Sequence, residues 1–376
     1  MATSVLSRRR VVLGLSCAAL TRRSLGCTTS PPGQAAAYST TTGAAAPGGC
    51  AYPSMSAFVR RSDGSVETFH CGTRADAQSG PPNDRTAYRI GSLTKLFTGL
   101  AVLTLRDDGQ LTLDDPLERF LPEASRMQRA DPSFPPVTLR HIVTHTSGLP
   151  RIGGLNYARP SPCVTEAEVL ADIPSLRVVT CPGTKESYSN VAVALLGIAI
   201  GRAAGMRYRD FLTTRILAPL GMTDSVWDAR DVPPTRLAFG HDAFEAELPP
   251  DRTWNLGAME AMGGLYSSAR DLGIFANYQI TCATETCDDG PIRAASVRES
   301  QKRLFPSVST FGVNWMVLED PALGRVLGHT GALDDFSASI RVLLDRKVAV
   351  ATLLGISSPS SLDKETTDLA RKASSA

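Results

Sequence analysis

The chain has 376 residues, enough for one large domain or two, and its 43% hydrophobic and 20% charged residues are typical of a soluble globular protein. A formal net charge of +2 at pH 7 gives no electrostatic indication of a nucleic-acid partner. The first 49 residues contain five arginines and no acidic residue, so the part of the chain that follows them is mildly acidic.

Residues 1–49 have the composition of an export signal followed by a disordered linker. Arg8, Arg9 and Arg10 precede a ten-residue apolar run, 11–20, which is too short to span a bilayer and is typical of a bacterial signal of the twin-arginine type. Residues 28–49 are rich in small residues and proline, as linkers are. We therefore expect a secreted or periplasmic monomer without a transmembrane span. The alternatives are a disordered cytosolic tail and a lipid anchor at Cys27.

Six cysteines outside this segment fall into three close pairs. Cys50 and Cys71 flank a predicted hairpin with Asp63-Gly64 at its turn, so they can face each other across two strands. An even, clustered set favours an oxidising compartment, and the Cys-x-x-Cys pattern typical of a zinc site does not appear. Local pairing is the simplest of several connectivities. It predicts three disulfides: Cys50–Cys71, Cys163–Cys181 and Cys282–Cys287.

Strand-like segments occupy both ends of the remaining chain, and helix-like segments lie between them. Strands are predicted over 51–69, 312–318, 325–329, 336–344 and 348–353. Helices are predicted from Ser92 to about 107, from Thr138 to 143, and over 166–176, 191–204, 211–220, 269–281 and 362–372. This order predicts an α/β (α+β) fold in which one sheet, built from both ends of the chain, carries an inserted helical region. We place the sheet domain at 50–120 and 262–376 and the helical domain at 121–261.

Ser92 and Lys95 carry the first candidate for chemistry. Ser92 opens an apolar helix, and Lys95 lies three residues on, hence on the same face. A desolvated lysine amine can lose its charge and accept the proton of a neighbouring serine. The alternative is a capping serine beside a solvated lysine. Since the polar segment Ser361–Lys364 repeats the spacing, the spacing alone leaves both interpretations equal.

Two further motifs follow in the chain. Tyr188 and Asn190 point the same way if the backbone between them is extended. In such a pair, a phenol with a lowered pKa can transfer a proton and an amide can bind a carbonyl group of the substrate. The alternative is an ordinary turn with Asn190 as a helix cap. In the second motif, 329–332, Gly331 ends a strand and admits close approach of another segment, so that the N–H groups of Ala332 and Ser92 can form an oxyanion hole. The alternative there is a strand end with a satisfied histidine.

The sequence resembles the family of serine hydrolases that contains class C β-lactamases, serine-type D-alanyl-D-alanine carboxypeptidases and related esterases. The resemblance extends from about Cys50 to Leu354 and rests on 89–95 (RIGSLTK), 145–150 (HTSGLP), 182–184 (PGT) with 188–190 (YSN), 220–222 (LGM), 263–265 (GGL) and 329–331 (HTG). It implies a β-lactamase/transpeptidase-like fold, an antiparallel sheet flanked by helices, with the site between the two domains and neither metal nor cofactor.

The resemblance also implies the roles of individual residues. Ser92 is the expected nucleophile, Lys95 keeps the proton network poised, and Tyr188 is the expected base. Asn190 is expected to orient the substrate, while the strand residues His329, Thr330, Gly331 and Ala332 bind its third side. We interpret His145 and Ser147 as structural.

One departure bears on the substrate. The class C motif begins with a lysine where this chain has His329, which is mostly neutral at pH 7 unless its pKa is shifted. The sequence therefore predicts an exported acyl hydrolase that acts on D-Ala-D-Ala-type peptides or small esters. The alternatives are a β-lactamase and a catalytically idle module that binds cell-wall peptides or penicillins.

Overall fold

The computed structural model describes residues 41–42, 50–75, 79–155, 163–240, 255–284, 287 and 290–375. The predicted export signal and Cys27 lie outside the described residues, as does the second half of the loop after Gly221.

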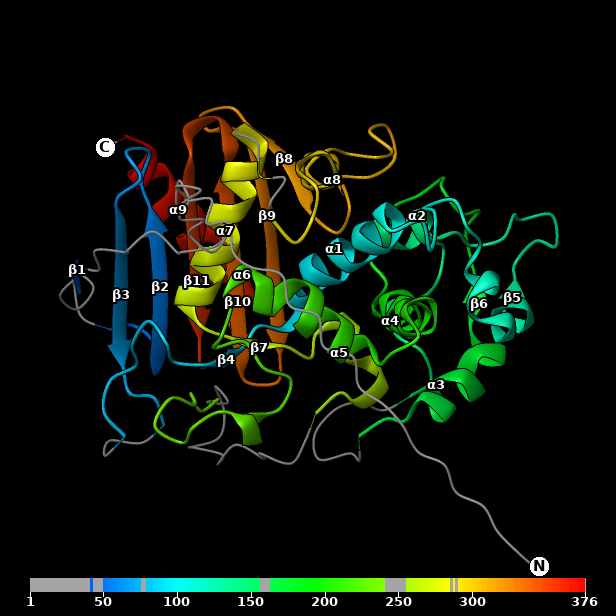
Figure 1. The fold of residues 1–376 in the computed structure, drawn as a ribbon, viewed down its shortest axis with the longest axis horizontal. Helices are drawn as coiled ribbons and strands as arrows, with labels where there is room; N and C mark the ends of the chain where they lie inside the picture. The colour runs from blue at the N-terminus through cyan, green and yellow to red at the C-terminus, as the bar shows by residue number, and fades with distance from the viewer. Residues whose placement is uncertain are drawn as a thin grey trace, which may run out of the picture. The chain divides into compact units, whose positions relative to one another are not determined.

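A seven-stranded sheet forms one side of the described fold (Figure 1). Its strand order is β1-β3-β2-β11-β10-β9-β8, so both ends of the chain contribute, as predicted. All neighbours are antiparallel except β1, which pairs in parallel with β3. The strands are β1 (Thr41–Thr42), β2 (Ser54–Arg60), β3 (Val66–Gly72), β8 (Met316–Asp320), β9 (Gly324–Leu333), β10 (Phe336–Leu343) and β11 (Val348–Leu354).

Helices cover both faces of this sheet, which explains why the central strands read as nearly continuous apolar runs. Neighbouring residues alternate between the faces: Phe58 packs in the cluster that contains α7 (Ala269–Thr284), and Val59 packs with Ala370 of α9 (Pro359–Ser375). Figure 1 shows α7 lying along the strands. The α7 helix approaches so closely that a Cβ on Gly273 would come within 2.4 Å of the Phe58 ring.

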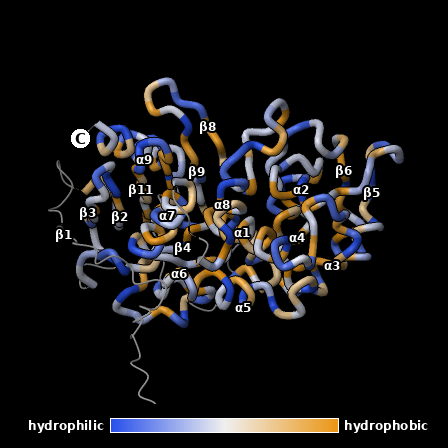
Figure 2. The backbone as a smooth tube through the Cα atoms, turned by 45° about the horizontal axis from the view of Figure 1, so that its top comes forward, coloured by the Kyte–Doolittle hydropathy of each residue, from blue (hydrophilic) through white to orange (hydrophobic). Residues whose placement is uncertain are grey.

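The second part of the fold consists of helices packed around α1 and α4. Figure 2 shows hydrophobic residues gathered along these two helices and the central strands. In α1 every residue from Thr94 to Leu105 is buried, and α4 is buried from Val191 to Ile200. The helices are α1 (Thr94–Asp107), α2 (Leu139–Val143), α3 (Glu166–Asp172), α4 (Asn190–Ala204), α5 (Tyr208–Leu212), α6 (Ala218–Leu220) and α8 (Ala294–Ser300), with the 3₁₀ turns η1 (Gly91–Leu93) and η7 (Gly257–Met262).

Local signals in the sequence explain where several elements start and stop. Gly64 adopts a φ of 89° at the β2–β3 turn, where the Ser65 N–H donates to the Asp63 carboxylate. Thr138 caps α2 as predicted, and Gly205 ends α4 in the left-handed conformation. The boundary predicted between the sheet domain and the helical domain remains a prediction.

No single helix among the described residues is long and apolar enough to cross a membrane. Taken together, α4 and the segment Tyr208–Leu220 meet the criteria of length and composition, with a bend of 74° between them.

Three expectations about secondary structure differ from the fold. Thr41–Thr42, expected in the linker, pairs as β1 with the outer edge of β3, which would otherwise leave its backbone groups without partners. The α8 helix was not predicted, because its alternation of small and polar residues carries no clear helical period. Strand β9 continues through Leu333, so Gly331 lies within a strand and does not end it.

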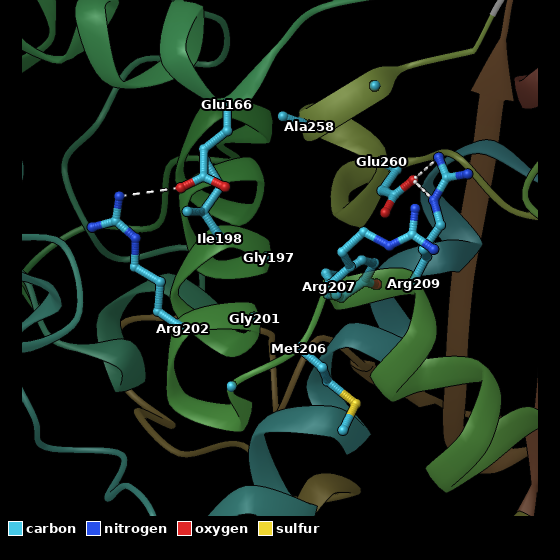
Figure 3. A pocket seen from close by; sticks show the side chains of 13 residues that line it. Glu166, Gly197, Ile198, Gly201, Arg202, Met206, Arg207, Arg209, Ala258 and Glu260 are labelled. Atoms are coloured by element: carbon cyan, nitrogen blue, oxygen red, sulfur yellow. Dashed lines mark hydrogen bonds and ion pairs between the residues drawn. The ribbon is translucent and has the colours of Figure 1, made fainter.

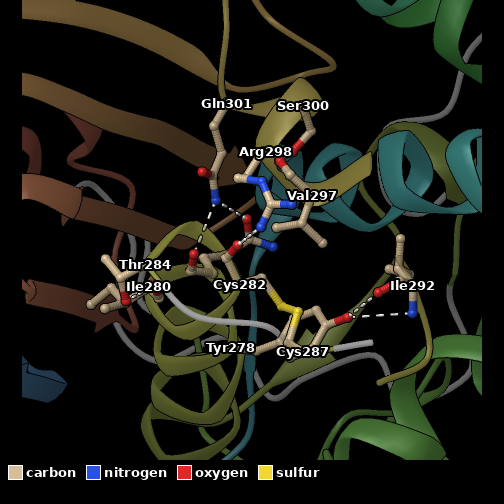
Figure 4. The surroundings of a disulfide bond; sticks show 11 residues. Tyr278, Ile280, Cys282, Thr284, Cys287, Ile292, Val297, Arg298, Ser300 and Gln301 are labelled. Carbon is tan, nitrogen blue, oxygen red and sulfur yellow. Dashed lines mark hydrogen bonds between the residues drawn. A yellow bond between two sulfur atoms is a disulfide. The ribbon is translucent and has the colours of Figure 1, made fainter. Parts of the chain in front are cut away.

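Two of the three predicted disulfides are formed: Cys50–Cys71 and Cys282–Cys287. Figure 4 shows that the second bridge lies at the end of α7, where Tyr278 donates to the carbonyl of Ile292 at 2.7 Å and Arg298 donates to the carbonyl of Cys282 at 2.9 Å.

The predicted third bridge, Cys163–Cys181, is wrong: both residues are thiols in the structure. Their backbones are held by different partners. The carbonyl of Val164, next to Cys163, accepts from Ala258 of η7. Gly183, just after Cys181, donates to Thr146 in the HTSGLP loop. Sequence proximity therefore did not bring these two side chains together.

Removal of the Cys50–Cys71 bridge is expected to lower the free energy of unfolding by about 3 kcal/mol, because the unfolded chain regains the entropy of an open loop. The measurement is denaturant unfolding of the variant Cys50→Ser/Cys71→Ser. The matched control is Cys163→Ser/Cys181→Ser, for which we expect a change below about 1 kcal/mol. Equal losses in the two variants would contradict this assignment of bridges.

Candidate active site

The three predicted motifs meet at one cavity of about 520 Å³. It lies between η1, the start of α4 and strand β9. Its lining residues are Ser92, Arg151, Glu186, Tyr188, Asn190, Phe311, Met316, His329, Thr330, Gly331, Ala332, Pro359, Ser360 and Asp363.

Ser92 lies in the 3₁₀ turn η1, directly before α1, and its side chain reaches the cavity. The Lys95 side chain is completely buried beneath it. The Lys95 amine contacts the Ser92 hydroxyl oxygen at 2.9 Å and donates to the carbonyl of Met262. Among the described residues, no carboxylate pairs with this amine. The second serine–lysine spacing, Ser361 and Lys364, lies exposed on α9.

Burial shifts the Lys95 amine toward its neutral form. Desolvation, with a smaller contribution from the positive charge of Arg151, holds the pKa of Lys95 well below its ordinary 10.5. A neutral amine keeps two N–H donors and gains a lone pair. It can therefore donate to Met262 and accept the proton of Ser92, which is the arrangement required of a base for this serine.

The carbonyl of Met262 belongs to η7, and the buried surroundings of η7 fix its position. Thr98 of α1 donates to the neighbouring carbonyl of Ala261 at 2.8 Å. The carboxylate of Glu260 accepts from Arg209, at 2.9 Å from Nε. A Cβ on Gly197 of α4 would come within 2.4 Å of the Ala261 Cβ, so α4 packs directly on η7.

Figure 3 shows this region as the wall of a second cavity, about 650 Å³, behind α4. Its charged side chains are engaged in ion pairs, Arg202 with Glu166 and Arg209 with Glu260. None of its lining residues is a serine, threonine, cysteine or histidine. The first cavity is therefore the better candidate for an active site.

The Tyr188 ring is surrounded by the side chains of Lys95, Arg151 and His145. The Lys95 amine is 5.0 Å and the Arg151 guanidinium carbon 5.1 Å from its centroid, and the His145 ring stacks on it at 4.2 Å. Burial raises the pKa of Tyr188 to about 12, although its hydrogen bond with Ser92 and the charge of Arg151 act in the opposite direction. Desolvation outweighs both, so Tyr188 does not have the lowered pKa that would favour a phenol as a general base. At neutral pH this phenol holds its proton.

Two buried residues of the HTSGLP loop support this ring and its loop. His145 Nδ1 accepts from the backbone N–H of Ser189 at 3.2 Å, and the ring lies against Tyr188. Ser147 accepts from the N–H of Leu149 at 3.3 Å. Neither side chain lines the cavity. These contacts support the interpretation of both residues as structural.

Tyr188 and Asn190 reach the cavity from the same side, as an extended Ser189 (φ −126°, ψ 114°) requires. The Ser189 hydroxyl points away and donates to the carbonyl of Pro150 at 2.6 Å. Ser189, not Asn190, caps α4 by accepting from the N–H of Ala192. The amide oxygen of Asn190 is buried and has no hydrogen-bond partner among the described residues.

Strand β9 closes the opposite side and lies against the Ser92 turn. A Cβ on Gly331 would come within 2.0 Å of the Ile90 carbonyl oxygen and 3.1 Å of the Ser92 nitrogen. A Cβ on Gly91 would come within 2.8 Å of the Ala332 nitrogen. Only residues without a Cβ allow this approach. It places the two segments that carry the expected oxyanion donors, the backbone nitrogens of Ser92 and Ala332, side by side.

His329 is buried and neutral. Its Nδ1 lies 2.6 Å from the carbonyl oxygen of Thr330, and because a carbonyl only accepts, Nδ1 carries the proton. Nε2 is buried without a hydrogen-bond partner among the described residues. Burial, which outweighs the opposing hydrogen bond to the Thr330 carbonyl, lowers the pKa of His329 to about 3. This residue therefore supplies no positive charge for a substrate at neutral pH.

The structure adds three groups that the motifs did not indicate. Arg151 follows the HTSGLP loop directly, Glu186 precedes Tyr188 by two residues, and the Met262 carbonyl precedes the GGL motif. Adjacency to a motif was the available signal for each, but a backbone carbonyl carries no side-chain signal. Among the residues that the structure describes, no three His, Cys, Asp or Glu side chains gather as a metal site would require.

The chain is similar to known proteins of one family. The beta-lactamase family model matches residues 42–375. Penicillin-binding protein 4* of Bacillus subtilis is 28% identical over 294 residues, which are 72% of this chain and 61% of that protein. The D-alanyl-D-alanine-carboxypeptidase/endopeptidase AmpH of Escherichia coli is 30% identical over 56% of this chain and 53% of its own length. Esterase EstB of Burkholderia gladioli is 31% identical over 69% of this chain and 74% of its own length.

Solved structures share the fold. A beta-lactamase/D-alanine carboxypeptidase from Yersinia pestis superposes with a TM-score of 0.70 at 23% identity, over 86% of this chain and 93% of that one. The octameric penicillin-binding protein homologue from Pyrococcus abyssi gives 0.67 at 27% identity, over 82% and 71% of the two chains. The chain thus spans between half and about three fifths of the length of the first curated relatives that it matches.

The neutrality of His329 predicts its titration. The unfolded chain binds a proton at this histidine near pH 6.5 and the folded protein only near pH 3, so this residue destabilises the fold progressively as the pH falls through that window. In nitrogen-15 NMR, His329 should keep its Nδ1–H form from pH 8 to pH 5. The signal is assigned by its disappearance in His329→Gln. A titration midpoint near 6.5 would contradict the buried neutral form.

Proposed function

The chain belongs to the beta-lactamase family, and we propose that it is a serine acyl hydrolase that forms an acyl-enzyme at Ser92. One observation carries the proposal: a fully buried lysine amine, with no carboxylate partner among the described residues, lies 2.9 Å from the hydroxyl of Ser92. A buried amine without a carboxylate destabilises the fold unless it is neutral, and the neutral amine is a base.

In the proposed acylation step, the Ser92 oxygen attacks the substrate carbonyl carbon while its proton passes to the Lys95 amine. The Tyr188 phenol, which holds its proton at neutral pH, then protonates the leaving oxygen or nitrogen and regains a proton from Lys95. The bond to the leaving group breaks and the acyl group stays on Ser92. In deacylation, water attacks the ester, and the same groups move its proton to the Ser92 oxygen.

This assignment differs in order from the role that the resemblance implies for Tyr188. With a pKa of about 12, the phenol keeps its proton at neutral pH and cannot accept one from Ser92 in the free site. Lys95 is the better first base, because its strongly lowered pKa leaves the amine neutral with a lone pair. We therefore propose that Lys95 accepts the serine proton and that Tyr188 relays it to the leaving group.

The backbone groups of Ser92 and Ala332 are proposed to bind the oxyanion. Their nitrogens belong to the two backbone segments, η1 and β9, that Gly91 and Gly331 allow to come into contact. Negative charge that develops on the carbonyl oxygen is then stabilised by fixed N–H dipoles, which require no reorganisation during the reaction. Asn190 would orient the rest of the substrate through its unpartnered amide oxygen.

For the substrate, we propose D-Ala-D-Ala-type peptides or small esters. Relatives named as a carboxypeptidase/endopeptidase and as an esterase support both classes at similar identity. The neutral His329 departs from the fixed cation of the class C motif, and we therefore keep β-lactams as the alternative substrates. The two disulfides support export, as they require an oxidising compartment. The monomeric state remains a prediction.

The proposed roles predict graded losses of activity. Ser92→Ala should abolish hydrolysis of p-nitrophenyl acetate and labelling by a fluorophosphonate or a fluorescent penicillin. Lys95→Ala and Tyr188→Phe should each lower kcat/KM by about 10²–10⁴, the usual contribution of a proton-transfer group. Rates on a D-Ala-D-Ala peptide and on nitrocefin, measured alongside, identify the preferred acyl group.

The chain offers a matched control for the serine–lysine pair. Ser361→Ala/Lys364→Ala removes the same two residue types at the same spacing from the exposed face of α9 and should leave every rate unchanged. Full activity of Lys95→Ala, or label on a residue other than Ser92, would refute the proposed mechanism.

A further inference from the structure

The charged side chains that line the cavity differ in whether another protein group already satisfies them. Glu186 accepts from the hydroxyls of Ser309 and Thr310 at 3.0 and 2.9 Å and from the Thr310 N–H at 2.6 Å. Asp363 pairs with the buried guanidinium of Arg341. Arg151 is exposed, and among the described residues its guanidinium has neither a carboxylate partner nor a hydrogen bond.

The backbone that carries Arg151 is fixed on three sides. Its carbonyl accepts from the N–H of Asn190, the first residue of α4, at 2.8 Å. The preceding carbonyl, of Pro150, accepts from Ser189 at 2.6 Å. Three residues further on, the N–H of Gly154 donates to Asp172 of α3 at 3.0 Å. Arg151 is therefore anchored to the same helix start that positions Tyr188 and Asn190.

The guanidinium is also held in a defined place relative to the reacting groups. It lies over the Tyr188 ring at 5.1 Å, a contact that orders the side chain and leaves its N–H donors available. A guanidinium presents these donors in a planar fork that matches the two oxygens of a carboxylate. Since His329 on the facing strand is neutral, Arg151 is the cation through which this cavity can attract an anionic substrate.

We propose that Arg151 determines substrate specificity by binding a carboxylate of the acyl substrate on the Tyr188 side of the cavity. The inference rests on the proposed function and extends it: the preferred substrates are esters or peptides that carry one carboxylate within reach of Arg151. A carboxylate fits better than a doubly charged phosphate, because one guanidinium faces a cavity that already contains the carboxylate of Glu186.

Two pairs of esters test the charge preference on either side of the bond that breaks. Mono-4-nitrophenyl glutarate and 4-nitrophenyl valerate differ by a carboxylate on the acyl side. The acetate esters of 3-hydroxybenzoate and of phenol differ by a carboxylate on the leaving side. In at least one pair, the wild-type protein should prefer the charged ester in kcat/KM by about tenfold or more, as expected for a hydrogen-bonded ion pair. Equal rates within both pairs would overturn the proposal.

Variants of Arg151 locate the source of the preference. Because the charge of Arg151 also contributes to lowering the pKa of Lys95, replacement alters turnover of every ester, so the measured quantity is the ratio within a pair. Arg151→Gln should reduce that ratio about tenfold, whereas Arg151→Lys should retain part of it, because an ammonium keeps the charge but loses the planar fork. The control Lys185→Gln removes an exposed charge three residues before Tyr188, outside the cavity lining, and should leave the ratio unchanged. A ratio insensitive to Arg151→Gln would contradict the assignment.

A binding measurement separates this proposal from the proposed function. In Ser92→Ala protein, calorimetry should find tighter binding of the carboxylated ester than of its neutral partner, and Arg151→Gln in the same background should remove the difference. This result supports the role of Arg151 even if no hydrolysis is seen, whereas equal binding of both esters overturns it even if Ser92 is acylated.

Discussion

The site depends on one unfavourable group, the completely buried amine of Lys95. Ionised and without a counter-ion, such a group would strongly destabilise the fold, so the structure favours its neutral form. Two oxygens partner it, the carbonyl of Met262 and the hydroxyl of Ser92. Both must be held in place. The surroundings of η7 and the burial of α1 provide that restraint, which explains why Glu260, Arg209 and Thr98 lie behind the reacting groups.

A second constraint is the close approach of β9 to the Ser92 turn. The two segments are far apart in the sequence, and the sheet brings them together because strands from both ends of the chain share it. Glycine at 91 and at 331 allows the backbones to touch. Packing of β9 against η1 therefore brings together the proposed oxyanion donors, the backbone N–H groups of Ser92 and Ala332, without a dedicated side chain. The sheet thus positions β9 beside the residues that η1 and the start of α4 contribute to the cavity.

Much of this site followed from the sequence because its parts are local patterns. Ser92 with Lys95, Tyr188 with Asn190, and the strand at 329–332 were each ambiguous alone, but the structure brings all of them to one cavity. Burial excludes the alternative of a solvated lysine in the first pair: Lys95 is fully enclosed, while Lys364, at the same spacing from Ser361, is exposed. A spacing cannot report burial, which depends on what packs against the helix.

The errors have the same physical origin. The pKa of Tyr188 is raised because the ring is enclosed by groups from other segments, which no motif encodes. Cys163 and Cys181 are close in sequence but are held by η7 and the HTSGLP loop respectively. Arg151 was not predicted as a site residue, because the feature that distinguishes it is the absence of an acidic neighbour among the described residues. That feature exists only in the folded cavity. Local patterns predicted which residues line one cavity, and tertiary packing decided their protonation and the groups around them.

The protonation of Lys95 is the most direct test of this account. Its side chain can be observed by NMR in protein labelled with nitrogen-15 and carbon-13 lysine, with the Lys95 signals assigned from Lys95→Arg. The account predicts that Lys95 titrates far below 10.5, while Lys364 on the exposed face of α9 serves as a reference in the same spectra. If Lys95 instead stayed fully protonated up to pH 10, it could not accept the proton of Ser92, and the proposed mechanism would be wrong.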